Sequence, residues 1–177
     1  MANYKALLSV FSKDRVGLIS LLTGHLFDRG IDLGDTSFAR LGDGGEFSSV
    51  LDVPADIAED TLSAELRSLD GLADAEIDIR RLNLANSETP PTDITHMIQC
   101  KGPDQPGLLA RLSEVFIDFD ANIVDLKSDQ STTPDGAIFV TRLAVNIPPD
   151  RAASCLAALG NTAESLGQHL IADAIGD

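Results

Sequence analysis

The sequence predicts an α+β fold of two tandem ferredoxin-like βαββαβ modules, each an antiparallel sheet with both helices on one face. One observation behind this prediction is an internal repeat, because residues 104–125 match residues 14–35 at a constant offset. Identical residues occur at Asp14/Asp104, Gly17/Gly107, Leu18/Leu108, Leu22/Leu112, Asp28/Asp118 and Asp35/Asp125. The other is that each half of the chain alternates strand and helix patterns in the order β-α-β-β-α-β. A duplicated module of roughly 85 residues follows.

The first module opens with an apolar run at residues 4–11 that is typical of a strand. Asp14 follows where a helix N-cap would accept a hydrogen bond from a free helix amide. A helix is predicted next and ends at Gly30, because apolar residues recur at helical spacing. Its stripe contains Leu18, Leu21, Leu22, His25 and Leu26. We interpret His25 as a packed, hydrogen-bonded member of this stripe, with a ligand role as the alternative.

A β-hairpin is predicted after this helix. Residues 32–41 have strand character, with Phe38 and Leu41 as apolar points. The sequence Gly-Asp-Gly-Gly at residues 42–45 supplies the positive φ angles of a tight reversal. Residues 46–53 then pair back as the third strand.

The second half of the module is predicted to contain a helix and a fourth strand. Residues 54–56 open the helix and Gly71 ends it, with Ile57, Leu62, Leu66 and Leu69 as its apolar residues. The fourth strand is predicted at residues 75–82, with Ile77, Ile79 and Leu82 on one face. A polar, proline-containing segment at residues 83–93 is predicted to be a linker. The expected modules are therefore residues 1–82 and 94–177.

The second module repeats this order. Its strands are predicted at residues 94–100, 123–130, 137–147 and 168–174. Its first helix carries Leu108, Leu109, Leu112, Val115, Phe116 and Phe119, and its second helix opens at residues 148–150 and extends to about Leu166. The hairpin loop at residues 131–136 is predicted to be longer than its counterpart in the first module.

Composition excludes several classes of function. The net charge of −15 repels a phosphate backbone, so direct nucleic-acid binding is not expected. A soluble, hydrated surface is the simplest reading of this acidity, and a docking face for a basic protein is the alternative. No membrane span or signal peptide is recognised, so the expected location is cytoplasmic. Cys100 and Cys155 are far apart in sequence and are expected to be buried thiols, with a redox or metal role as the alternative.

Catalytic signatures are missing from the sequence. It contains no H-E-x-x-H, G-x-S-x-G or P-loop motif, and its three histidines are scattered at positions 25, 96 and 169. We therefore expect a protein that is not an enzyme and that has neither a cofactor nor a metal site.

The two strand-to-helix loops offer binding chemistry instead. Free amides and the partial positive charge at a helix N-terminus suit a carboxylate or another small anion. Gly17 and Gly107 would let a ligand approach the backbone closely, although tight packing of the helix on the sheet also explains them. Asp14 and Asp104 fit either plain N-capping or pairing with the ammonium group of a ligand.

These loops resemble a known signature. The sequences Asp-Arg-Val-Gly-Leu at residues 14–18 and Asp-Gln-Pro-Gly-Leu at residues 104–108 are similar to the D-R-P-G-[LI] motif of ACT domains. Asn122-Ile123 resembles the N-I at the start of that family's second strand. The tandem arrangement, with Ser-Phe-Ala-Arg-Leu-Gly at residues 37–42 and Glu46-Phe47, is most similar to the glycine cleavage system transcriptional repressor group.

The resemblance implies a regulatory protein whose paired ACT modules sense a small molecule, an amino acid such as glycine, in the groove between modules. It also implies transcriptional control through a protein partner, a DNA-binding activator, without direct contact to DNA. The open sheet edges lead us to expect a homodimer. The alternative is a protein-interaction adaptor of the same fold that binds no ligand. The implied ligand-binding residues are Ser12, Lys13, Asp14, Arg15, Val16, Gly17, Leu18, Asp32, Leu33, Gly102, Pro103, Asp104, Gln105, Pro106, Gly107, Leu108, Asn122 and Ile123.

The two modules are also expected to pack together, since each alone is small. In the geometry that the resemblance implies, each loop faces the start of the other module's second strand. The loop near Gly17 would then meet Asn122, whereas the loop at residues 102–108 would meet Asp32. We therefore predict unequal grooves, because Asp32 repels a ligand carboxylate and Asn122 does not.

Overall fold

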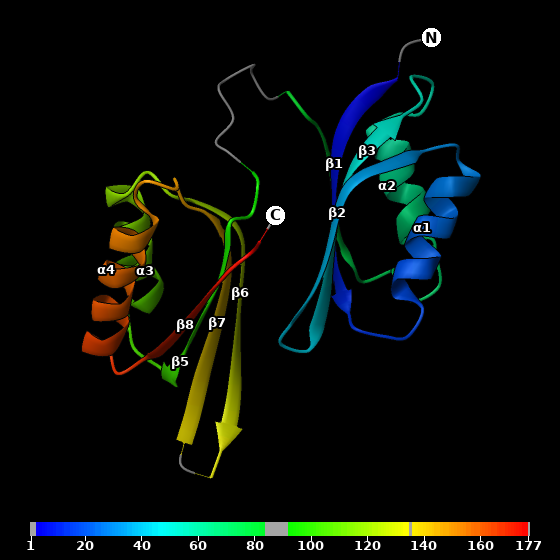
Figure 1. The fold of residues 1–177 in the computed structure, drawn as a ribbon. Helices are drawn as coiled ribbons and strands as arrows, with labels where there is room; N and C mark the ends of the chain where they lie inside the picture. Colours follow the sequence, from blue (N-terminus) through cyan, green and yellow to red (C-terminus); the bar gives the residue numbers. More distant parts are fainter. Residues whose placement is uncertain (1–2, 84–91, 135, 177) are drawn as a thin grey trace. The chain divides into compact units, whose positions relative to one another are not determined.

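The computed structural model describes residues 3–83, 92–134 and 136–176. The chain divides into two compact units, Met1–Ser87 and Glu88–Asp177. Each unit contains a four-stranded antiparallel sheet with two helices on one face, as the ribbon in Figure 1 shows for each unit by itself. The predicted fold class is therefore confirmed. Most of the predicted linker, residues 84–91, lies outside the described residues.

The first module has the predicted order of elements. They are β1 (Tyr4–Lys13), α1 (Leu18–Asp28), β2 (Asp32–Leu41), β3 (Gly44–Val53), α2 (Glu59–Arg67) and β4 (Glu76–Arg81). The strand order across the sheet is β2-β3-β1-β4, and every neighbouring pair is antiparallel. In this order the strands that a helix connects are not neighbours. β3 lies between β1 and β2, which α1 connects, and β1 lies between β3 and β4, which α2 connects.

The second module has the same topology. Its elements are β5 (His96–Pro103), α3 (Leu108–Asp118), β6 (Asn122–Thr133), β7 (Gly136–Asn146), α4 (Ala152–Ser165) and β8 (His169–Ala174). The strand order is β6-β7-β5-β8, which is the order of the first sheet in equivalent strands. None of the helices in the described segments is long and apolar enough to cross a membrane.

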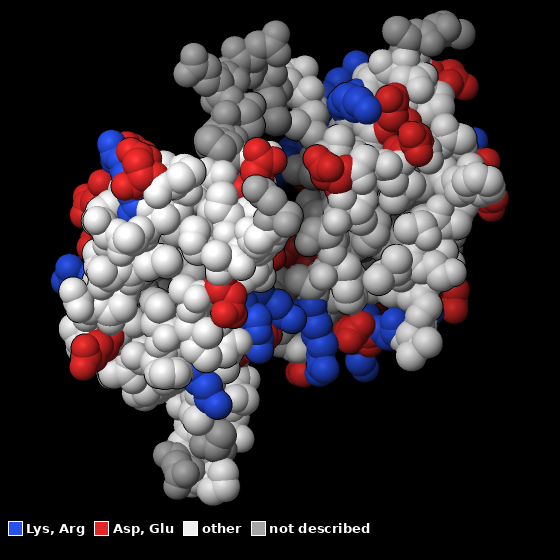
Figure 2. Space-filling model, in the orientation of Figure 1, with Lys and Arg blue, Asp and Glu red and all other residues white. Residues whose placement is uncertain are grey.

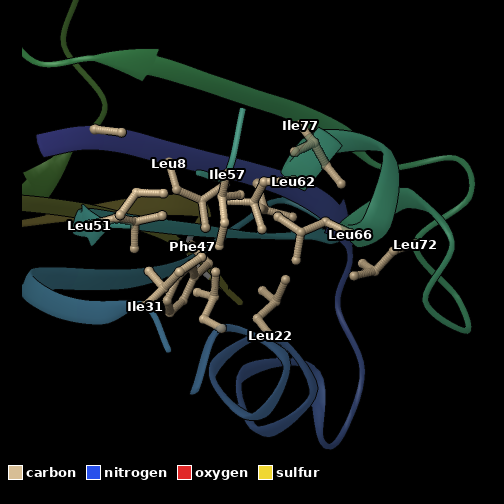
Figure 3. Close-up of a cluster of buried hydrophobic side chains, with 14 of the residues drawn as sticks. Leu8, Leu22, Ile31, Phe47, Leu51, Ile57, Leu62, Leu66, Leu72 and Ile77 are labelled. Atoms are coloured by element: carbon tan, nitrogen blue, oxygen red, sulfur yellow. The ribbon is translucent and has the colours of Figure 1, made fainter. Parts of the chain in front are cut away.

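Each module has its own hydrophobic core between sheet and helices. In β1, alternate residues Ala6, Leu8 and Val10 are fully buried, which is the period of two expected for one covered sheet face. Leu18, Leu22 and Leu26 of α1 recur every four residues and are buried against that face. Figure 3 shows Phe47 of β3 in the middle of this cluster, near Ile31. The second core includes Leu112, Phe116 and Leu143 and shares no residue with the first.

The end of α1 follows the predicted pattern. Gly30 has a φ of 68°, and the amides of Gly30 and Ile31 donate to the carbonyls of Phe27 and Leu26 at 2.9 and 3.0 Å. This pair of bonds satisfies carbonyls that the helix leaves open, and the left-handed conformation favours glycine. His25, in the last turn, lies 3.3 Å from a carboxylate oxygen of Glu65, so the prediction of a packed, hydrogen-bonded histidine is confirmed.

Both ends of α2 and the end of β4 differ from the prediction. α2 ends at Arg67 and not at Gly71, because the chain continues in tight turns in which the Leu66 carbonyl accepts from Leu69 and the Leu69 carbonyl accepts from Leu72. The helix predicted to open at residues 54–56 begins at Glu59, because Pro54 first forms a turn in which its carbonyl accepts from Ile57 at 3.0 Å. Ile57 still packs into the core from outside the helix. The prediction that Leu82 shares a face with Ile77 is also wrong. β4 ends at Arg81, so Leu82 lies outside the strand. In a longer strand Leu82 would still lie on the face opposite Ile77, because successive side chains point to opposite faces of a sheet.

The predicted long hairpin loop in the second module is also wrong. Residues 131–133 continue β6, and Thr133 pairs directly with Gly136 of β7. β-branched threonines favour extended backbone, so this polar run lengthens the strands instead of the loop. The result is a hairpin that extends past the end of β5, which is visible at the yellow segment in Figure 1.

Candidate functional site

The loops after β1 and β5 have nearly the same backbone geometry. The residue that begins each helix is glycine in the left-handed conformation, with φ of 88° at Gly17 and 83° at Gly107. The carbonyl of Gly17 accepts the first intrahelical bond from Leu21 at 2.9 Å, and that of Gly107 accepts from Arg111 at 3.0 Å. The amides of the first helical turn, which have no partner within a helix, therefore face each loop.

Neither aspartate of the repeated motif caps its helix. The N-cap residues are Gly17 and Gly107, and no side chain forms a capping bond at either position. The Asp14 amide instead donates to the Asp43 carbonyl at 3.3 Å, and its carboxylate lies 3.7 Å from Nε of Arg40. The capping interpretation of Asp14 and Asp104 is wrong because a turn intervenes between each aspartate and its helix.

The two glycines are required by backbone conformation and not by close packing. A Cβ added to Gly17 or Gly107 would have no atom within 4 Å outside its immediate neighbours. The alternative explanation, tight packing of the helix on the sheet, is therefore wrong for both positions. Their positive φ is the property that other residues adopt only at a cost.

A cavity of about 530 Å³ lies at the first of these loops. It is lined by Asp14, Arg15, Gly17, Leu18, Ile19, Ser20, Thr23 and Phe38. The lining combines a carboxylate, the N-terminal turn of α1 and two hydroxyls with an apolar wall that includes the Phe38 ring. Such a mixture of a few polar groups with apolar walls is typical of sites for small organic molecules.

Arg15 connects this loop to another one. Its Nη2 donates a hydrogen bond to the carbonyl of Asp70, in the segment between α2 and β4. Its guanidinium stands against Gly71, where an added Cβ would lie 2.8 Å from Cζ of Arg15. The cation therefore lines the cavity while its orientation is fixed by the α2–β4 segment.

The second loop is held by a residue that the sequence did not single out. Gln168, which is only 5% exposed, precedes β8, and its Nε2 donates to the Pro103 carbonyl at 2.6 Å. Gly102 makes this contact possible, because an added Cβ there would lie 2.7 Å from the Gly167 carbonyl oxygen. Gln168 did not belong to the predicted site, and neither did the cavity residues Ile19, Ser20, Thr23 and Phe38. Ile19, Ser20 and Thr23 could have been found, because they follow Gly17 along one side of the predicted helix.

The structure brings together only part of the predicted site. Residues 13–18 are contiguous around the first loop and residues 103–108 around the second, with Ser12 buried at the end of β1. Within its own module, Asp32 lies at the opposite end of the sheet, because it pairs with Asp52, which pairs with Lys5. Leu33 lies at the same end as Asp32, and Asn122 and Ile123 lie at the equivalent end of the second sheet. That these strand starts serve the loop of the other module stays a prediction.

Two further cavities lie outside the predicted site. One of about 490 Å³ is lined by residues of the first module that include Phe11, Glu46 and Glu76, and one of about 360 Å³ lies between α3 and α4. Among the described residues, no group of three or more His, Cys, Asp or Glu side chains is arranged to hold a metal ion.

The two cysteines are buried in the second core, as predicted. Burial raises the pKa of the Cys100 thiol to about 11 and also raises the pKa of the Cys155 thiol. Desolvation disfavours a thiolate, so neither group is suited to nucleophilic chemistry near neutral pH.

Charged side chains are interspersed over the surface. On the face shown in Figure 2, groups of Lys and Arg lie among groups of Asp and Glu in each module, with large uncharged areas between them. Several opposite charges form exposed pairs, such as Lys5 with Asp52 and Arg142 with Asp129. Exposed pairs of this kind contribute little stability, because water and salt screen them.

Substitution of the loop glycine is expected to have the opposite effect from substitution of a helix glycine. Gly17→Ala should lower the free energy of unfolding by about 1–2 kcal/mol, because alanine disfavours a φ of 88°. Gly24→Ala should raise it by about 0.5–1 kcal/mol, because Gly24 lies inside α1 with open space around its Cβ position. Urea denaturation of both variants measures the difference. Stabilisation by Gly17→Ala would contradict the assigned backbone conformation.

Comparison with known proteins identifies the fold. The family model of the ACT domain matches residues 95–172. The structure of an unknown protein from Galdieria sulphuraria is similar with a TM-score of 0.73 and 22% identity, covering 98% of this chain and 99% of that one. A provisionally named glycine cleavage system transcriptional repressor is similar with a TM-score of 0.68 and 13% identity, covering all of both chains. Among curated protein sequences, none matches this chain.

Proposed function

We propose, for a chain with a tandem ACT-like architecture whose residues 95–172 match the ACT domain, a non-catalytic regulatory function based on sensing a small ligand. The ligand is an amino acid, with glycine as the first candidate. The sensor controls transcription through a protein partner, a DNA-binding activator, and operates in the cytoplasm, with a homodimer as its assembly.

The cavity at the Gly17 loop is the observation that carries this proposal. It combines, within about 530 Å³, the N-terminal turn of α1 and the carboxylate of Asp14. The helix N-terminus attracts the carboxylate of an amino acid, and the Asp14 carboxylate attracts its ammonium group. An amino acid is the smallest common metabolite that carries both charges, so this pair of features favours an amino acid over a simple anion.

The apolar side of the cavity bears on which amino acid is selected. Ile19 and Phe38 supply its apolar lining, whereas Ser20 and Thr23 supply hydroxyls. The Thr23 hydroxyl already donates to the Ile19 carbonyl at 2.9 Å, so it is available as an acceptor. A small ligand leaves the rest of this cavity open to water, so the two hydroxyls keep hydrogen-bond partners.

Action through a protein partner is supported by the charge of the chain. With 28 acidic and 13 basic residues, the protein is not expected to bind DNA directly at physiological salt. The similar structure that is named for a glycine cleavage system transcriptional repressor supports a role in transcriptional control. The second candidate function is an adaptor that binds a partner without a ligand, and the exposed apolar residues Phe27 and Ile117 favour it.

Thermal unfolding with a panel of the twenty common amino acids separates these two functions. A ligand that binds only the folded protein at one hundred times its Kd should stabilise it by about 2.7 kcal/mol. We expect glycine or another small amino acid at this concentration to raise the melting temperature of the module that binds it by about 11–22 °C, because 1 kcal/mol corresponds to about 4–8 °C for a module of this size.

Glycinamide and N-acetylglycine are the matched controls, because each removes one of the two charges that the cavity is proposed to bind. Both should give no shift at concentrations where glycine does. If none of the twenty amino acids raises the melting temperature, the sensor function is wrong and the adaptor is preferred.

A further inference from the structure

We propose that Arg15 and Gln168 are positioning residues, each of which fixes the ligand loop of its own module to the segment before the last strand of that module. The inference rests on the proposed function, since it assigns the residues that hold the sensing loops in their binding conformation. It adds a mechanical connection between each loop and the edge of its sheet.

The first contact is made by Arg15. This side chain leaves the β1–α1 loop and donates from Nη2 to the Asp70 carbonyl, three residues beyond the end of α2. Gly71 has a φ of 75°, and a Cβ at this position would approach Cζ, Nε and Nη2 of Arg15 to 3.0 Å or less. The guanidinium therefore occupies a space that the glycine leaves open, and the loop is held at its centre, two residues before Gly17.

The second contact has the opposite direction. Here the side chain comes from the segment before the last strand, and Gln168 donates to the Pro103 carbonyl at the start of the β5–α3 loop. Gly102 leaves the space for it, because an added Cβ would lie 2.8 Å from Cδ of Gln168. Gln168 Oε1 is buried and has no hydrogen-bond partner among the residues that the structure describes. A buried acceptor without a partner costs free energy, so packing alone does not explain this residue.

The two contacts connect equivalent parts of the two modules through unrelated residues. Each joins the loop before the first helix to the segment before the last strand, and each uses a glycine to make room. The counterpart of Arg15 is Gln105, so the repeat did not preserve the side chain that makes the contact. Both last strands, β4 and β8, lie at an edge of their sheets. A ligand that orders either loop is therefore connected to a sheet edge, where a partner strand can bind.

Hydrogen–deuterium exchange on the full chain tests the proposal without a ligand. Arg15→Ala should speed exchange of the amides at residues 14–21 by about tenfold or more, because a hydrogen bond from a charged donor is lost. Exchange should also rise at residues 69–72, while the amides of Leu8 and Leu51 in the core stay unchanged. Gln168→Met, which keeps the length but removes the donor, should speed exchange at residues 104–111 several-fold.

Two variants separate positioning from general stability. Arg67→Ala is the matched control, because Arg67 also donates to a backbone carbonyl, that of Ile77 at 2.8 Å, and its other hydrogen bond is to Ser63 in its own helix. It should leave exchange at residues 14–21 unchanged. Arg15→Lys keeps a donor and should restore most of the protection. Gln168→Met removes the partnerless Oε1 as well, so the melting temperature should not fall even though the loop loosens.

Calorimetric titration with glycine gives the functional readout. Arg15→Ala should weaken glycine binding about tenfold relative to wild type, and Arg67→Ala should not change it. A wild-type protein that binds no glycine would refute glycine as the ligand, while the exchange data still decide the positioning roles. Unchanged exchange in Arg15→Ala and Gln168→Met, or equal acceleration by Arg67→Ala, would overturn the proposal.

Discussion

Replacing Phe47 by alanine is expected to destabilise the first module by about 3–5 kcal/mol, the range for removing a fully buried phenylalanine. Its side chain is completely buried in the core between the sheet and α1, so truncation leaves a cavity that its neighbours fill only in part. A domain of about 85 residues has a total stability of about 4–13 kcal/mol, so this single change should unfold a large fraction of a weakly stable module.

The unfolding of each module in urea can be measured separately by hydrogen exchange or by proteolysis at single sites. Because the two cores share no residue, Phe47→Ala should lower the midpoint for the first module more than that for the second. Phe116→Ala, which removes an equally buried ring from the second core, is the matched variant and should have the reverse effect. An equal shift of both midpoints in either variant would show that the modules unfold as one unit.

Gly17→Ala is expected to weaken amino-acid binding more than tenfold, whereas Gly107→Ala should have a smaller effect. At the first loop the Asp14 carboxylate lies 3.7 Å from Arg40, so the site retains a cation beside its acid. The counterpart of Arg40 at the second loop is the neutral Gln130. An exposed pair of opposite charges contributes about 0–1 kcal/mol, which corresponds to a preference of up to about fivefold. A ligand carboxylate should therefore prefer the first loop.

Titration calorimetry on the two variants decides which loop binds. Gly24→Ala serves as the control, because it changes a glycine of α1 away from the loop without a steric contact. Asn122→Ala tests the additional prediction that the first loop uses the start of β6, and it should weaken binding as strongly as Gly17→Ala. Equal losses at Gly17 and Gly107, or a greater loss at Gly107, would show that the loops are assigned wrongly.

The order of elements could be predicted because periodicity records which face of each element is covered. The alternation of Ala6, Leu8 and Val10 and the spacing of Leu18, Leu22 and Leu26 determine a strand and a helix without further information. Gly17 and Gly107 could be predicted as loop residues because the repeat marks both. Their left-handed backbone explains why glycine recurs there.

Other features depend on contacts between residues distant in sequence. The cap predicted at Asp14 failed because a turn separates this residue from α1, and its amide donates to the Asp43 carbonyl of a hairpin that no local pattern connects to it. The long loop predicted at residues 131–136 failed because strand pairing outweighs the polar character of the serine and threonines. Gln168 could not be found, since its partner Pro103 lies 65 residues earlier and a lone glutamine carries no signal.

The burial of both native thiols makes the chain convenient for site-specific spectroscopy. With the Cys100 pKa near 11, almost none of this group is thiolate at neutral pH, and both cysteines have no exposed surface. A cysteine introduced at Phe27, which is 79% exposed, would therefore react with a maleimide far faster than either native thiol. A second label at Ile117, which is 73% exposed, would place one dye on each module. Energy transfer between the dyes would then follow the response to a ligand in the otherwise unaltered protein.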